Sequence, residues 1–181
     1  MGFLAADKTM AVPVTWAEAD GNLQFTVPLD IEAVTEEGLW LFGRANAALP
    51  EREVTLGLRW VGVPSRFEVF DRFDRRPIGG HNNKGLGPRE LRFRPFDGTH
   101  RHPLDVNAAL AIGLLRAMAE NLPVAVPVEP DPAIWRAFLA TVADQYRIHD
   151  LVTAPPPPWQ YELLALSAGD GRQGRKRGRG G

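Results

Sequence analysis

The stretch Glu-Val-Thr-Leu-Gly-Leu-Arg-Trp, residues 53–60, places an apolar side chain at every second position. This period of two is typical of a β-strand with one buried face, because successive side chains of a strand point to opposite sides of the sheet. A turn follows, and residues 66–73 again carry apolar side chains on one face. We therefore predict a β-hairpin over residues 52–73.

Apolar residues upstream of this hairpin also predict strands. Residues 12–27 alternate around a central Asp-Gly-Asn turn and predict a second hairpin, and residues 39–42 predict a short buried strand. Downstream, residues 74–89 are rich in Gly, Asn and Pro and predict a long loop, after which residues 91–95 are expected to return as a strand.

The periodicity changes near residue 103. Apolar residues recur at helical spacing over residues 106–122 and again over 131–148, which predicts two amphipathic helices. Strands that precede helices along the chain are typical of the α+β class. We therefore expect an antiparallel sheet of about five to six strands in the N-terminal two-thirds, with both helices packed on one face.

The composition fits a chain that buries a core, since 44% of the 181 residues are hydrophobic. There is no cysteine, which excludes disulfides, thiolate metal ligands and cysteine nucleophiles. No apolar run approaches the roughly 20 residues that span a bilayer, so we expect no membrane association and a cytoplasmic location. Residues 1–168 are predicted to form one domain, and the Gly- and Arg-rich residues 169–181 a disordered basic tail.

Charge is unevenly distributed along the chain. Residues 64–102 hold nine bases and five acids, a balance of +4, and residues 169–181 hold five bases and one acid, also +4. The remaining segments are acidic, so the total is −1. Two positive segments on an acidic body predict an anionic partner, either a nucleic acid or an acidic protein, bound through residues 66–102 and the tail.

Three of the four histidines lie inside the first positive segment: His81, His100 and His102. His100 and His102 are two apart, so on an extended backbone both point to one face. Such a pair can chelate a divalent metal, with His81 or Asp97 as a third ligand. It can also act on a phosphate without a metal, one imidazole serving as base and another as acid.

Basic residues nearby are candidates for holding an anionic group. Arg92, Arg94 and Arg101 can bind a phosphate or stabilise the charge that develops on it, and Lys84 lies in the same loop. A short His-x-His is also common in proteins without a site, and His102 can simply buttress the start of the next helix. No cofactor is predicted apart from a possible divalent metal.

The run from Gly80-His81-Asn82-Asn83 to Thr99-His100-Arg101-His102 resembles TumE-like proteins, which occur in bacterial toxin–antitoxin pairs. The resemblance covers about 50 residues and rests on a His-x-His followed by a helix. Phe73-Asp74-Arg75 stands where that family has Asp-Asn. The resemblance implies RNA or a cognate protein as the partner.

Three functions stay open from the sequence. The first is a binding module for an anionic partner, either RNA or an acidic protein. The second is an enzyme that acts on a phosphodiester through the three histidines and nearby arginines. The third is a structural subunit of an oligomer, and the oligomeric state itself does not follow from the sequence.

Overall fold

The hairpin predicted at residues 52–73 lies at the centre of an antiparallel sheet in the computed structural model, which describes residues 2–160. Its strands are β5 (Val54–Trp60) and β6 (Val69–Arg75), joined through the short helix η1 (Ser65–Phe67). The two strands pair from Val54 opposite Arg75 to Arg59 opposite Val69. The basic tail predicted at 169–181 lies outside the described residues.

The sheet has eight strands in the order β1-β3-β4-β5-β6-β9-β10, with β2 paired to β3, so the α+β class is confirmed and the strand number exceeds the five to six predicted. The hairpin predicted over residues 12–27 is formed by β2 and β3, although residues 11–16 are not a strand. The bounds of the remaining strands are β1 Lys8–Met10, β2 Ala17–Ala19, β3 Asn22–Ile31, β4 Val34–Asn46, β9 His100–His102 and β10 Val126–Pro127.

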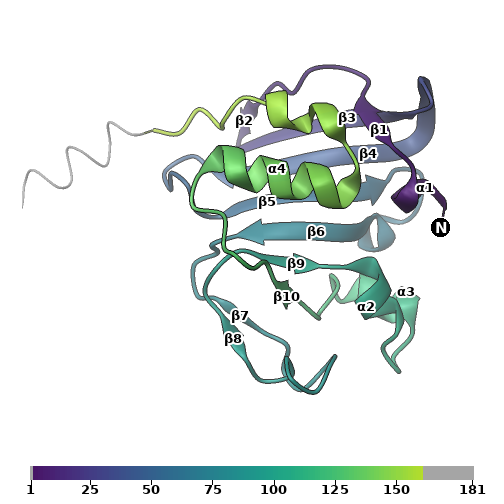
Figure 1. The fold of residues 1–181 in the computed structure, drawn as a ribbon, viewed down its shortest axis with the longest axis vertical. Coiled ribbons are helices and arrows are strands. Elements are labelled where there is room, and N and C mark those ends of the chain that lie inside the picture. The colour runs from purple at the N-terminus through teal and green to yellow at the C-terminus, as the bar shows by residue number, and fades with distance from the viewer. Residues whose placement is uncertain (1, 161–181) are drawn as a thin grey trace, which may run out of the picture.

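One face of the sheet is covered by the helix α4 (Trp135–Tyr146), which lies in front of β4 and β5 in Figure 1. Its apolar side packs on the inward side chains of the sheet, and together they form the main hydrophobic core. This helix is the one predicted over 131–148. It is followed by the short helix η2 (His149–Thr153), and α1 (Gly2–Ala5) lies near the N-terminus.

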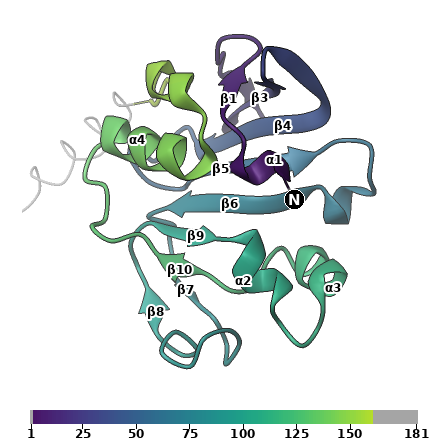
Figure 2. The same ribbon diagram turned by 45° about the vertical axis from the view of Figure 1, so that its right-hand side comes forward.

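The helix predicted over residues 106–122 is divided into two short helices, so the prediction of one continuous helix is wrong. They are α2 (Leu104–Ala108) and α3 (Leu114–Ala119), and Gly113 between them has φ +79°. That left-handed conformation favours glycine and cannot continue a right-handed helix. Both helices lie beside the end of β9 rather than on the face that α4 covers (Figures 1 and 2).

The predicted long loop forms an arm beyond β9 and β10. Its base is a two-stranded ribbon of β7 (His81–Asn82) and β8 (Pro95–Phe96), so the strand expected at 91–95 is present only at its last residue. Figure 2 shows this arm extending away from the main sheet. Among residues 2–160, no helix combines the length and apolar character needed to cross a membrane.

The two faces of β6 have different roles. Phe73 and Arg75 point toward α4, where Phe73 packs edge-on against Phe138 with ring centroids 6.4 Å apart. Arg72 and Asp74 point to the opposite face, where the arm lies. The alternation of β6 thus separates the core from a polar site on the other side.

Candidate metal centre

The two histidines of the His-x-His sequence lie on β9, next to β6 in the sheet. Asp74 pairs directly with His100, and Arg72 pairs with His102. Direct partners across an antiparallel pair have their side chains on the same face, close to each other. This register therefore gathers two imidazoles, one carboxylate and one guanidinium on one small area of sheet.

The arm brings the third histidine to the same place. His81 is the first residue of β7, and its ring centroid lies 5.3 Å from that of His100 and 4.9 Å from that of His102. One ring nitrogen from each of the three lies within 4.8 Å of the other two. His100 and His102 are each 1% exposed and His81 is partly buried. The structure thus brings together all three histidines chosen from the sequence.

A backbone carbonyl contacts one nitrogen of each imidazole. His102 Nδ1 lies 2.5 Å from the Leu122 oxygen, His100 Nδ1 lies 3.1 Å from the Gly98 oxygen, and His81 Nε2 lies 3.2 Å from the Pro123 oxygen. A carbonyl only accepts hydrogen bonds, so each of these nitrogens carries the proton. For His81 and His100 the opposite nitrogen then presents a lone pair, whereas His102 Nε2 lies 3.2 Å from both Asp74 Oδ2 and Arg72 Nη2. Metal-binding histidines in proteins are commonly fixed in this way.

Two buried asparagines hold the segment that supplies two of these carbonyls. Asn83 accepts a hydrogen bond from the Ala125 nitrogen at 2.8 Å and donates to the Ala125 oxygen at 3.0 Å. Asn107 accepts from the Val124 nitrogen at 3.0 Å and donates to the Val124 oxygen at 2.9 Å. Both side chains are almost fully buried. Residues 122–125 are therefore fixed against the arm on one side and α2 on the other.

Asp74 is the acidic member of the cluster. Its Oδ2 lies 3.2 Å from His102 Nε2 and 3.8 Å from His100 Nε2, and it accepts a hydrogen bond from Arg72 Nε at 2.9 Å. Burial alone would raise the pKa of Asp74. The contacts with His102 and Arg72 outweigh that effect and hold the pKa well below its usual range. Asp74 is therefore a carboxylate at neutral pH.

The imidazoles of His81 and His100 are uncharged at neutral pH. Burial, reinforced by the neighbouring His102, lowers the pKa of His100 to about 4. Burial likewise lowers the pKa of His81, again with a contribution from His102. A neutral imidazole is the form that binds a metal, and it needs no proton release first.

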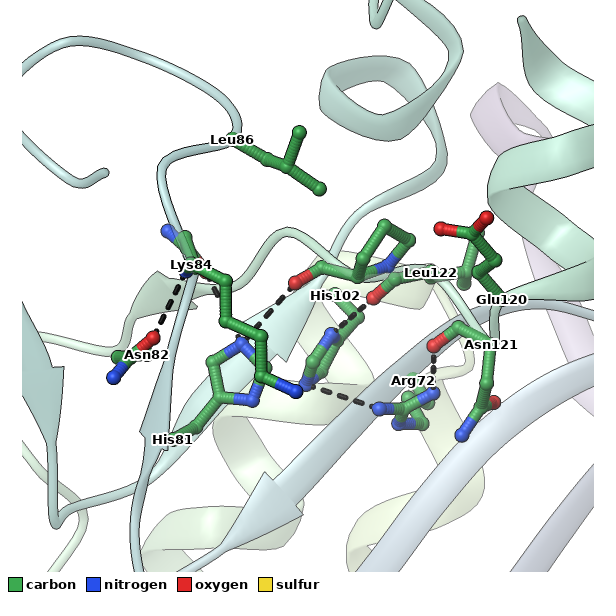
Figure 3. A pocket seen from close by; sticks show the side chains of 11 residues that line it. Arg72, His81, Asn82, Lys84, Leu86, His102, Glu120, Asn121 and Leu122 are labelled. Carbon is green, nitrogen blue, oxygen red and sulfur yellow. Dashed lines mark hydrogen bonds between the residues drawn. The ribbon is translucent and has the colours of Figure 1, made fainter. Parts of the chain in front are cut away.

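A pocket of about 330 Å³ opens onto the cluster. Figure 3 shows His81 and His102 side by side in it, with Arg72 bridging from His102 to the backbone of Asn121. Lys84 lines the same pocket from the arm. Arg72 Nη2 lies 3.2 Å from His102 Nε2, the nitrogen that faces the cluster. His81 and His102 therefore line a hollow that the cations Arg72 and Lys84 also line.

The other residues chosen from the sequence lie elsewhere. Arg101 points to the opposite face of the sheet, where its guanidinium bonds both oxygens of the buried Asp71 at 2.9 Å. Arg92 donates to the Gly87 oxygen, and Arg94 pairs with an exposed glutamate, both on the arm surface. Asp97 is exposed and is not part of the histidine group.

Several residues of the site were not chosen from the sequence. Arg72 and Asp74 look like members of a solvated charge cluster, yet their spacing of two is the same as that of His100 and His102. That shared period is the signal that could have placed them on one face. No local signal points to Asn83 or to the carbonyl groups of residues 122–123, because they reach the cluster only through tertiary contacts.

Three imidazoles at short mutual distance form a set that suits Zn²⁺, Fe²⁺, Ni²⁺ or Cu²⁺ rather than Mg²⁺ or Ca²⁺, which prefer oxygen ligands. Three protein ligands also leave a coordination position open, as in catalytic zinc sites. Comparisons with protein families, curated proteins and solved structures find no match to this chain, so the resemblance to TumE-like proteins gains no support from them.

Proposed function

We propose that this chain binds a divalent transition-metal ion through His81, His100 and His102, and uses it to hydrolyse a phosphodiester. The observation that carries the proposal is the convergence of three buried imidazoles whose ring nitrogens lie within 4.8 Å of one another. In a tetrahedral site the ligand nitrogens are about 3.3 Å apart, from metal–nitrogen bonds of about 2.0–2.1 Å. Small side-chain rotations bring the three nitrogens from their present spacing to the tetrahedral spacing.

The surroundings of the histidines support a metal more than metal-free acid–base catalysis. An acid–base pair needs one imidazole charged near neutral pH, and burial lowers the pKa of His81 and His100, so neither of these two supplies it. The three carbonyl contacts also orient the rings as they do around bound metals. Asp74 Oδ2 lies 3.2 Å from His102 Nε2 and 3.8 Å from His100 Nε2. At that distance the carboxylate supplies negative charge to the ion, either as a fourth ligand or through a hydrogen bond to an imidazole.

The flanking cations support a phosphate as the bound group. Arg72 and Lys84 line the pocket above the histidines, and both can bind non-bridging phosphoryl oxygens. A metal ion held by the three histidines would lower the pKa of a bound water and so supply hydroxide to attack phosphorus. A new P–O bond forms from the water oxygen, the P–O bond to the leaving alkoxide breaks, and that alkoxide takes up the proton released by the water.

Zinc titration of metal-free protein by calorimetry tests the metal site. We expect one equivalent to bind, with affinity falling at least tenfold in His100→Ala and in His102→Ala. His149→Ala is the matched control, because His149 is exposed and contacts Asp7 away from the cluster. Replacing zinc by Co²⁺ gives a visible spectrum that reports tetrahedral coordination. Absence of stoichiometric binding, or equal loss in the control, contradicts the proposal.

Hydrolysis of bis(4-nitrophenyl) phosphate tests the reaction. We expect release of nitrophenolate that stops on chelation and returns when metal is restored. Hydrolysis that continues after complete removal of the metal, and that still depends on His100 and His102, supports the metal-free imidazole mechanism instead. No hydrolysis by fully loaded protein contradicts the proposed reaction while leaving the metal site intact.

A further inference from the structure

We infer that the substrate of this centre is a single-stranded nucleic acid that lies across the arm of residues 81–97. The inference rests on the proposed function, because the strand is placed so that one of its phosphates reaches the histidine cluster. Three independent features of the arm support it: two adjoining hollows, one exposed aromatic ring and a group of cations.

The first feature is a second hollow. A pocket of about 380 Å³ is lined by Gly79, Gly80, Pro95 and Asp97, and it shares His81, Asn82 and Lys84 with the pocket of about 330 Å³ that opens onto the cluster. The two hollows therefore adjoin at His81, Asn82 and Lys84. Two adjoining hollows suit a chain that continues from one into the other, whereas a small ligand is usually enclosed in one.

The second feature is Phe93. Its side chain is 77% exposed, although large apolar residues of a folded domain are usually buried. The ring lies against Gly85, where an added Cβ would be 3.0 Å from it, so Gly85 brings the ring close to the backbone beside Lys84. One exposed aromatic face next to a cation is the arrangement on which single-stranded bases stack.

The third feature is the charge of the arm. Between residues 81 and 97 there are four bases and two acids, a balance of +2 within a chain whose total is −1. The four bases, all exposed, are Lys84, Arg89, Arg92 and Arg94. Arg92 and Arg94 flank Phe93 in sequence, so cations and a stacking surface alternate along the arm, and Arg94 also pairs with Glu129 at 3.1 Å. Cations alone suit any acidic partner, and the exposed ring among them favours unpaired bases.

Fluorescence anisotropy with labelled 12-nucleotide single strands of RNA and DNA tests this inference on the full chain. We expect Phe93→Ala to weaken binding about tenfold, in line with the stacking contribution of one base, and Phe93→Trp to restore it. Ile134→Ala is the matched control, since Ile134 is 61% exposed but precedes α4 on the other face. A preference for one sugar identifies RNA or DNA as the substrate.

The charge contribution is measured by salt dependence. We expect Arg92→Gln with Arg94→Gln to reduce the slope of log affinity against log salt by about 1 to 2, and Arg136→Gln on the opposite face to leave it unchanged. The inference is overturned if the chain binds duplex or poly-glutamate as tightly as single strands. It is also overturned if Phe93→Ala does not change the affinity. If zinc still binds in that case, the metal centre survives. If Phe93→Ala weakens binding of single strands but zinc does not bind, only the proposed function is contradicted.

Discussion

Asp74 and His100 are direct partners across strands β6 and β9, and Asp74 Oδ2 lies 3.8 Å from His100 Nε2 and 3.2 Å from His102 Nε2. A single carboxylate oxygen therefore contacts two of the three histidines. The register of two neighbouring strands fixes this arrangement, so it does not depend on the arm. Of the three histidines, the arm supplies only His81.

Replacing Asp74 by asparagine tests its contribution to metal binding. The change keeps the size of the side chain and removes the negative charge next to the imidazoles. We expect zinc affinity to fall about 10- to 100-fold, as for other residues that support metal-bound histidines. Asp97→Asn is the control, because Asp97 is the acidic ligand proposed from the sequence and lies outside the histidine group. A larger loss in Asp97→Asn than in Asp74→Asn would assign the acidic ligand to Asp97.

Replacing Arg72 by methionine tests whether its guanidinium competes with the metal. Arg72 Nη2 lies 3.2 Å from His102 Nε2, on the side where the ion is proposed to bind. We expect zinc affinity to rise severalfold in the variant, because a nearby positive charge is removed. Inhibition by inorganic phosphate is expected to weaken at the same time. Weaker zinc binding would show that Arg72 supports the site rather than competes.

Asp71 on the opposite face of β6 is expected to matter for stability and not for the metal. This carboxylate is 1% exposed and accepts hydrogen bonds from Arg101, Tyr146 and the Leu104 nitrogen. Asp71→Ala leaves the partly buried charge of Arg101 without its ionic partner, so we expect a loss of about 3 kcal/mol in the free energy of unfolding. Urea denaturation measures it.

The control for Asp71 is Tyr146→Phe, which removes one hydrogen bond from the same network. We expect a loss of about 1 kcal/mol there. Zinc affinity of the folded protein should be unchanged in both variants, because α4 and the histidines lie on different faces of the sheet. A change in zinc affinity with normal stability would show that the two faces are coupled.

Lys8 gives a pH dependence that is separate from the metal site. Its ammonium group donates to three carbonyl oxygens, including that of Tyr146 at 2.8 Å. Burial, helped by the charge of Arg147 and opposed by Asp7, lowers the pKa of Lys8 from 10.5 to about 8. Between these values the unfolded chain holds a proton that the folded chain has lost, so stability rises with pH.

We therefore expect the free energy of unfolding to increase from pH 8 to 9.5 by on the order of 1 kcal/mol. Lys8→Met should abolish this increase. The range stops below pH 10 because burial, reinforced by Asp71, raises the pKa of Tyr146, so ionisation of Tyr146 in the unfolded chain lowers stability there. Urea midpoints in matched buffers measure the effect, and a flat or falling profile in the unmodified protein contradicts it.

Local patterns predicted some elements and failed at others for physical reasons. The alternation of residues 53–60 predicts β5 because a half-buried strand has a period of two. The helical spacing over residues 106–122 fails because Gly113 adopts a positive φ and the buried amide of Asn107 binds backbone groups outside its own helix. Spacing alone does not reveal either constraint.

The sequence by itself determined that the chain forms an antiparallel α+β fold and that His100 and His102 share a face. Both follow from the period of two along a strand, which is a local property. Only the tertiary structure decided that His81 joins them and that Asp74 and Arg72 are their partners on the neighbouring strand. It also decided that Arg101 points to the other face of the sheet. These relations depend on which strands become neighbours and in what register, and pairing across 20 to 30 residues of chain is not encoded in any short window.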